Sequence, residues 1–102
     1  MRKAVRQGDV LLIPVKTVTG ERIAPVKRRY TVAEGEQTGH HHSIAANAAI
    51  AAFLGPDGQF IEGSKKMKLS HQEHSALTLD EGAYQVIQQR RASDHEVTRV
   101  SD

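Results

Sequence analysis

Phe53-Leu-Gly-Pro-Asp-Gly-Gln-Phe-Ile61 is the stretch that decides the fold class. Its centre joins Pro56, which has a fixed φ, to Asp57 and Gly58, two residue types that favour turns, and apolar residues flank it on both sides. A turn of this kind between two apolar runs predicts a β-hairpin. The chain is therefore expected to be built mainly of β-strands.

Further strands are predicted on both sides of this hairpin, at spacings of roughly ten residues. The run Val10-Leu-Leu-Ile13 is stopped by Pro14, as in a buried strand that ends at a sheet edge. The other predicted strands are Arg29–Ala33, Lys66–Leu69, Ser75–Leu79 and Ala83–Ile87, the last two joined by a turn at Asp80-Glu-Gly82. This pattern favours one small β-barrel or β-sandwich over residues 1–102, rather than a βαβ fold.

Two segments are less regular. Residues 45–52 contain six alanines in eight positions, which favours a helix, although eight residues are few for an isolated helix and neighbouring strands could absorb them. The conformation of this segment stays open. Ser93-Asp-His-Glu96 has the spacing of a capping box, so a short helical turn is expected over residues 94–100.

Composition restricts the type of site. A chain of 102 residues corresponds to one domain, and the absence of cysteine excludes disulfides and thiolate metal sites. The longest apolar stretch, Ala48–Leu54, is too short to span a bilayer, and the basic residues 1–6 run straight into Gly8-Asp9 without the layout of a signal peptide. A cytoplasmic protein without membrane contact is expected.

The strongest chemical signal is the concentration of five of the six histidines in two clusters, His40-His41-His42 and His71-Gln-Glu-His74. On a strand, His40 and His42 would point to one face while His41 points away. Imidazole is a common ligand of transition metals, so the pattern predicts a divalent metal held between two strands. The ordinary alternative is a solvated loop, and His95 is expected at the surface.

His71 and His74 lie three residues apart, so they converge only if residues 70–72 form a turn or bulge before the next strand. Three imidazoles and a water would give the general form of a catalytic zinc or iron centre, whereas four would close the site. Glu34, Glu36 and Glu73 are close in sequence and could serve as a further ligand, as an orienting partner or as a general base. We take Glu36 and Glu73 as the candidates for proton transfer.

Several enzyme classes lack their motifs here. The sequence contains no Gly-x-x-x-x-Gly-Lys phosphate loop, no Gly-x-Gly-x-x-Gly segment and no Gly-x-Ser-x-Gly nucleophile elbow. Whether the protein is an enzyme stays open at this point.

The arrangement of Gly39-His-His-His42, then His71-Gln-Glu-His74, then Leu79–Val86 resembles the order of motifs in cupins. Cupins are small β-barrels in which a Gly-led His-x-His motif and a second motif bind Fe, Mn, Zn or Ni. The resemblance implies a cupin-like barrel with a metal, but the glutamate that usually follows His-x-His is missing, as is the Pro-x-Gly of the second motif. It covers about half of the chain.

Most of the chain is also similar to a group of small uncharacterised bacterial and phage-associated proteins. The shared segments are Gln7–Val10, Glu34–His42, His71–His74 and Gly82–Arg90. This resemblance implies no activity, but it favours His40, His42, His71 and His74 as the metal ligands.

Two hypotheses follow. In the first, the protein is a cupin-like metalloprotein that binds a divalent transition metal (Zn, Fe, Ni or Mn) and acts on a small molecule. In the second, it is a phage- or mobile-element-associated binding module whose basic clusters contact a protein or, with less support from the four aromatic residues and the net charge of +2, a nucleic acid. A homodimer would hide the edges of an open barrel. The basic clusters include Lys27-Arg28-Arg29 and Lys65-Lys66.

Overall fold

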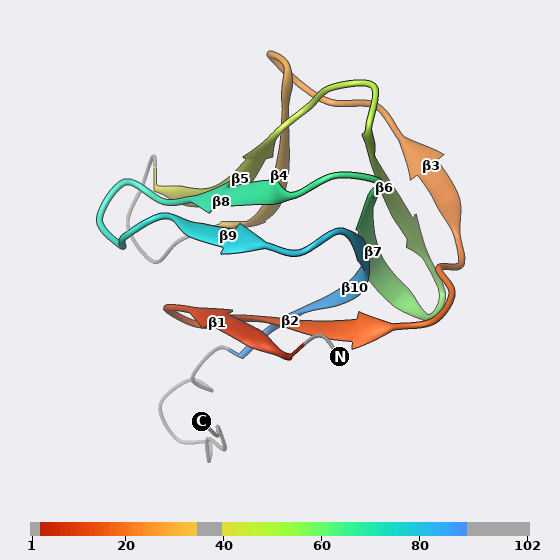
Figure 1. Ribbon diagram of the computed structural model, residues 1–102, viewed down its shortest axis with the longest axis horizontal. Helices are drawn as coiled ribbons and strands as arrows, with labels where there is room; N and C mark the ends of the chain where they lie inside the picture. Colours follow the sequence, from red (N-terminus) through yellow and green to blue (C-terminus); the bar gives the residue numbers. More distant parts are fainter. Residues whose placement is uncertain (1–2, 35–39, 90–102) are drawn as a thin grey trace.

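The computed structural model describes residues 3–34 and 40–89, and it arranges their strands in two antiparallel sheets (Figure 1). The larger sheet has six strands, in the order β1 (Val5–Gln7), β2 (Val10–Val15), β10 (Gly82–Gln88), β7 (Gly58–Gly63), β6 (Ile50–Gly55) and β3 (Glu21–Ile23). The smaller sheet has four, in the order β4 (Arg29–Glu34), β5 (His41–Ala45), β8 (Met67–Ser70) and β9 (Leu77–Leu79).

The prediction of a mainly β chain is confirmed. Of the two architectures that the sequence left open, a small barrel or a sandwich, the described residues form two open antiparallel sheets and no closed barrel. Within the described residues, β1 and β3 remain the edges of one sheet, and β4 and β9 remain the edges of the other. The turn at residues 80–82 explains part of this, because β9 and β10 do not pair as a hairpin. The chain instead passes there from one sheet to the other, and the Tyr84 hydroxyl donates a hydrogen bond to the carbonyl oxygen of Asp80, at 2.8 Å.

The hairpin over residues 53–61 is confirmed. Strands β6 and β7 pair from Ile50↔Gly63 to Gly55↔Gly58, which leaves Pro56-Asp57 as the turn. Gly58 has a φ of 119°, a conformation that L side chains rarely adopt, so glycine is required at this position.

Strand β2 runs one residue past Pro14 instead of ending before it. Strand β1 pairs with Val10–Leu12, so within residues 3–34 and 40–89 Pro14 has no partner strand on this side of β2. A missing N–H costs no ladder hydrogen bond there, which is why the strand tolerates proline.

The alanine-rich segment forms no helix. Strand β5 ends at Ala45 and β6 begins at Ile50, with a turn organised by Asn47 between them. The Asn47 side-chain oxygen accepts the N–H of Ala49, at 2.8 Å, and its carbonyl accepts the N–H of Ile50, at 3.1 Å. An asparagine that hydrogen-bonds to the backbone in this way competes with the helix, and strand pairing does the rest.

No helix at all occurs in residues 3–34 and 40–89, so none there could cross a membrane. The helical turn predicted over residues 94–100 falls outside the described residues.

The hydrophobic core lies between the two sheets. Both sheets contribute buried residues to it, among them Val10, Leu12, Ile61, Tyr84 and Val86 from the larger, and Tyr30, Val32, Ile44, Leu69 and Leu79 from the smaller. The β1–β2 turn, the start of β5 and the β8–β9 connection lie at the same end of the molecule, on the left in Figure 1. This end brings together segments that are more than sixty residues apart in sequence.

Candidate metal centre

The four histidines predicted as metal ligands come together at this end of the molecule. His40 precedes β5, His42 lies within it, and His71 and His74 lie in the β8–β9 connection. The ring centres are 4.4 Å apart for His42 and His71, 4.6 Å for His71 and His74, 5.7 Å for His40 and His71, and 6.0 Å for His42 and His74. The bend after β8 is therefore what lets His71 and His74 converge.

His42 is the buried member of the cluster. Strand alternation turns it toward the interior together with Ile44, and only 1% of its surface is exposed. The pairing of β4 and β5 shifts register opposite it, between Thr31 and Ala33. Burial lowers the pKa of His42 most, the nearby charge of His71 adds to this, and the Asp9 carboxylate acts in the opposite direction.

Gln7 fixes the tautomer of His42. The buried Gln7 amide nitrogen donates to the carbonyl oxygens of Leu69, at 3.1 Å, and Ser75, at 2.8 Å, so its side-chain oxygen must be the atom that faces His42. That oxygen lies 2.8 Å from His42 Nδ1. Because the oxygen can only accept, Nδ1 carries the hydrogen, and the neutral imidazole has its lone pair on Nε2.

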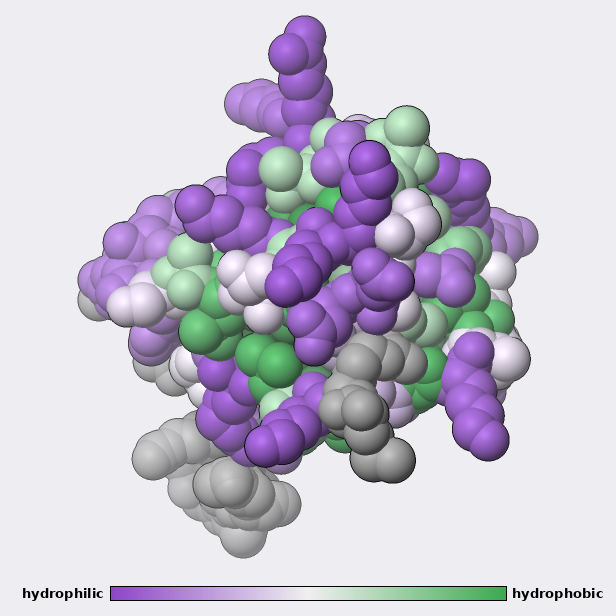
Figure 2. All heavy atoms as spheres, in the orientation of Figure 1, coloured by the Kyte–Doolittle hydropathy of each residue, from purple (hydrophilic) through white to green (hydrophobic). Residues whose placement is uncertain are grey.

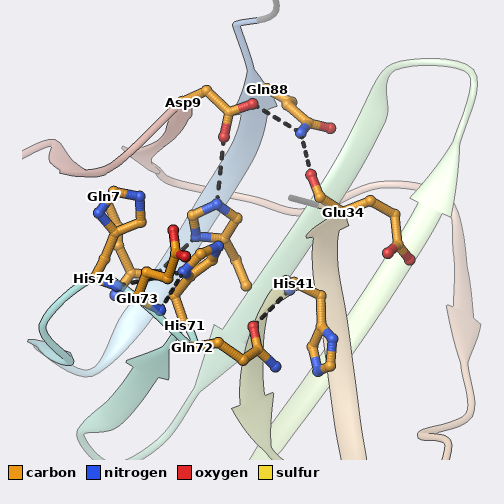
Figure 3. A network of polar contacts seen from close by, with 10 residues as sticks. Gln7, Asp9, Glu34, His41, His71, Gln72, Glu73, His74 and Gln88 are labelled. Carbon is orange, nitrogen blue, oxygen red and sulfur yellow. Dashed lines mark hydrogen bonds and ion pairs between the residues drawn. The ribbon is translucent and has the colours of Figure 1, made fainter. Parts of the chain in front are cut away.

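Asp9 faces this lone pair. Its Oδ1 lies 3.3 Å from His42 Nε2, while its Oδ2 accepts a hydrogen bond from the Gln88 side chain, at 3.0 Å (Figure 3). Gly8, with a φ of 59°, makes the tight β1–β2 turn that carries Asp9 to this position. A lone pair and a carboxylate at this distance repel each other unless a proton or another cation lies between them.

Sequence reasoning missed both Gln7 and Asp9. They belong to the segment Gln7-Gly-Asp-Val10, which the resemblance to small phage-associated proteins had singled out without a role. A polar pair around a glycine turn was the available signal, but only the fold shows that it meets the histidines.

His71 is held by the backbone of its own loop. Its Nδ1 accepts the N–H of Glu73, at 3.0 Å, and that of His74, at 3.4 Å. The hydrogen of a neutral His71 therefore lies on Nε2, which makes this nitrogen a donor rather than a metal ligand. Burial and the neighbouring imidazoles His74 and His40 lower the pKa of His71.

The three glutamates that lie close to the histidines in sequence differ in where the structure places them. Glu73 is exposed, and its Oε2 lies 3.7 Å from Nδ1 of His40, so it contacts the rim of the cluster. Glu34 is engaged through its backbone, since its carbonyl accepts the Gln88 side chain at 2.6 Å. Glu36 lies outside the described residues, and so does His95.

His41 lies outside the cluster. Figure 3 shows its ring turned away from His71 and Glu73, and its backbone N–H donates to the Gln72 side chain, at 2.8 Å. The alternation of β5 accounts for this, because His41 and His42 point to opposite faces.

The donor atoms of the cluster do not converge on one point. Across residues 3–34 and 40–89, no group of three or more His, Asp or Glu side chains is arranged to hold a metal ion. Nδ1 of His42 is bonded to Gln7 and Nδ1 of His71 to the backbone, so the Nε2 atoms are the ring nitrogens of these two residues that have no such bond. Asp9 and His42 lie at ligand-to-ligand distance, with 3.3 Å between Asp9 Oδ1 and His42 Nε2.

Comparisons with known proteins supply a family but no activity. No curated protein matches the chain, and no solved structure does. The chain matches a domain of unknown function, DUF8820, over residues 6–89, which include Gln7, Asp9 and all four clustered histidines. The chain belongs to the DUF8820 family.

Proposed function

We propose that this chain is a metal-binding β domain in which Asp9 and His42 are the fixed ligands of one divalent transition metal. The remaining ligands would come from His74 and His40, with His71 in reserve. The proposal keeps the cupin-like idea of two histidine motifs on facing segments, now within two open sheets.

One observation carries the proposal: the bare Nε2 of His42 is aimed at a carboxylate oxygen 3.3 Å away. Two donor atoms that each lie about 2.1 Å from one ion are separated by roughly 3.0–3.4 Å at octahedral or tetrahedral angles. Metal-binding histidines typically donate their other ring N–H to an oxygen, as His42 does to Gln7.

Protonation of His42 is the competing way to satisfy the same pair. Burial works against it, since the pKa of His42 is lowered and the neutral ring is favoured. A metal ion would supply the missing positive charge while the imidazole ring stays neutral.

A third ligand requires a side-chain rotation, and His74 is the best placed to make it. His74 is exposed, its ring is stacked at an angle of 13° to that of His42, and its Nε2 lies beside Gly8. His40 is half-buried, its Nδ1 lies 3.7 Å from Glu73 Oε2, and its ring meets the edge of the His71 ring, so it could also turn inward. His71 would first have to give up the backbone N–H groups of Glu73 and His74.

The donor set selects the class of metal. Imidazole nitrogen with one carboxylate and no thiolate suits zinc, iron, nickel or manganese better than magnesium or calcium. When bound, such an ion would hold a water or a small-molecule ligand at an open position.

Metal content tests this function directly. Untagged protein, purified without a nickel column, should contain about one equivalent of a transition metal by inductively coupled plasma mass spectrometry, or take up one equivalent in a zinc titration. Asp9→Asn should weaken that binding at least tenfold. Asp80→Asn, which removes the same charge from an exposed turn, is the matched control and should bind as the parent does.

A folded parent that neither contains nor takes up metal would overturn the proposal. Attention would then pass to the second hypothesis, a module that binds a protein or nucleic acid through its basic clusters. On the face seen in Figure 2, hydrophilic and hydrophobic residues are interspersed.

A further inference from the structure

The outer face of the four-stranded sheet carries an open pocket of about 300 Å³. Register places its residues on that face: Arg29 lies opposite Ala45, and Ser43 lies opposite Ser70. The pocket is lined by Arg29, His41, Ser43, Ser70, His71 and Gln72. None of these residues is acidic, so the lining is polar without negative charge.

Arg29 is held in place without neutralisation of its charge. Its Nε donates to the Ser43 hydroxyl, at 2.8 Å, and its Nη2 donates to the Ser43 carbonyl, at 3.3 Å. In the part of the chain that the structure describes, no carboxylate lies within ion-pair distance of its guanidinium. The remaining N–H groups of the fork are available to a planar or tetrahedral oxyanion.

Two other lining residues, Gln72 and His71, also have hydrogen-bond donors to offer. The Gln72 side-chain oxygen already accepts the N–H of His41, so the donors of its amide nitrogen are what it has left to offer. His71 spends its Nδ1 lone pair on the backbone, which puts the hydrogen of the neutral ring on Nε2. Both residues therefore favour an acceptor-rich ligand.

We infer that this pocket binds a small oxyanion, a carboxylate or a phosphate group, through the Arg29 guanidinium and the Gln72 amide. Strand β5 separates the pocket from the centre around His42, and His71 borders both. The pocket goes beyond the proposed metal function and does not depend on it, because Arg29, Gln72 and Ser70 take no part in the cluster.

Side-chain NMR on the metal-free protein tests the inference. Inorganic phosphate and, separately, oxalate are titrated at constant ionic strength while the ¹H–¹⁵N signals of Arg29 Nε and the Gln72 amide are followed. We expect saturable shifts at both positions with at least one of the two anions, and the anion that saturates tells phosphate from carboxylate.

Three variants separate a site from general charge attraction. Arg29→Gln should raise the dissociation constant of the anion at least tenfold. Arg29→Lys should retain only part of the affinity, because the guanidinium fork is lost. Arg6→Gln removes the same charge from exposed β1 and should leave binding unchanged. The inference would be overturned if neither anion gave saturable shifts. It would also be overturned if Arg6→Gln and Arg29→Gln weakened binding equally. Because metal is absent throughout, this result is independent of the metal proposal.

Discussion

The two halves of the histidine cluster differ in how firmly they are held. In the half formed by β5 and the β1–β2 turn, His42 is buried and both of its ring nitrogens face partners, Gln7 and Asp9. In the β8–β9 half, the His74 side chain is exposed and its ring lies against those of His42 and His71, while His71 is tied to the backbone of its own loop. The comparison suggests a centre with one preorganised half and one adjustable half, so substitutions should affect stability in the first and mainly affinity in the second.

The largest effect is expected from His42→Ala. The change leaves the Gln7 side-chain oxygen without its hydrogen-bond donor and creates a cavity in the interior. Together these should lower the free energy of unfolding by about 2–4 kcal/mol, and metal binding should be abolished. Urea denaturation measures the loss, and His41→Ala, on the opposite face of β5, should stay within about 0.5 kcal/mol of the parent. Equal losses in the two variants would show that the buried half is not special.

The adjustable half should respond in affinity instead. His74→Ala should weaken zinc binding at least tenfold in calorimetric titrations, because the rotating ligand is lost, and should leave metal-free stability nearly unchanged because the side chain is exposed. His71→Ala should weaken binding less, since Nδ1 of His71 is spent on the backbone. The reverse order would mean that the loop rearranges to free His71.

The contrast between the halves also explains what could be predicted from the sequence. The hairpin at Pro56-Asp57-Gly58 and the histidine clusters depend on local patterns, which a sequence displays directly. The choice between a barrel and a sandwich could not be made from the sequence, because the chain changes sheet at Asp80–Gly82 and nothing local distinguishes that corner from a hairpin turn. Gln7 and Asp9 were missed because their partners are the His42 ring and carbonyl oxygens more than sixty residues away.

A smaller effect, opposite in sign to ordinary ion-pair removal, is expected for Asp9→Asn in metal-free protein. The asparagine amide can donate to the bare Nε2 of His42, so a repulsive contact becomes a hydrogen bond worth about 1 kcal/mol. The midpoint of thermal unfolding should rise by roughly 4–8 °C. Asp80→Asn serves again as the control. A fall in the midpoint for Asp9→Asn alone would identify the pair as an imidazolium–carboxylate bridge.

The pH dependence of metal-free stability distinguishes the same two states without any substitution. The pKa of His42 is lowered in the folded protein, and that of His71 is lowered as well, so the unfolded chain takes up protons first as the pH falls below roughly 6.5. Stability should therefore be full above that pH and should decline gradually between pH 6.5 and 5.5, a range in which ordinary carboxylates stay ionised. His41→Ala should leave the slope unchanged, whereas His71→Ala should reduce it. If Asp9 instead held His42 as an imidazolium, the pKa of His42 in the folded protein would be raised. Stability would then increase as the pH falls from about 6.5 to 5.5. The sign of the slope thus decides whether the preorganised half of the cluster waits for a cation or already contains one in the form of a proton.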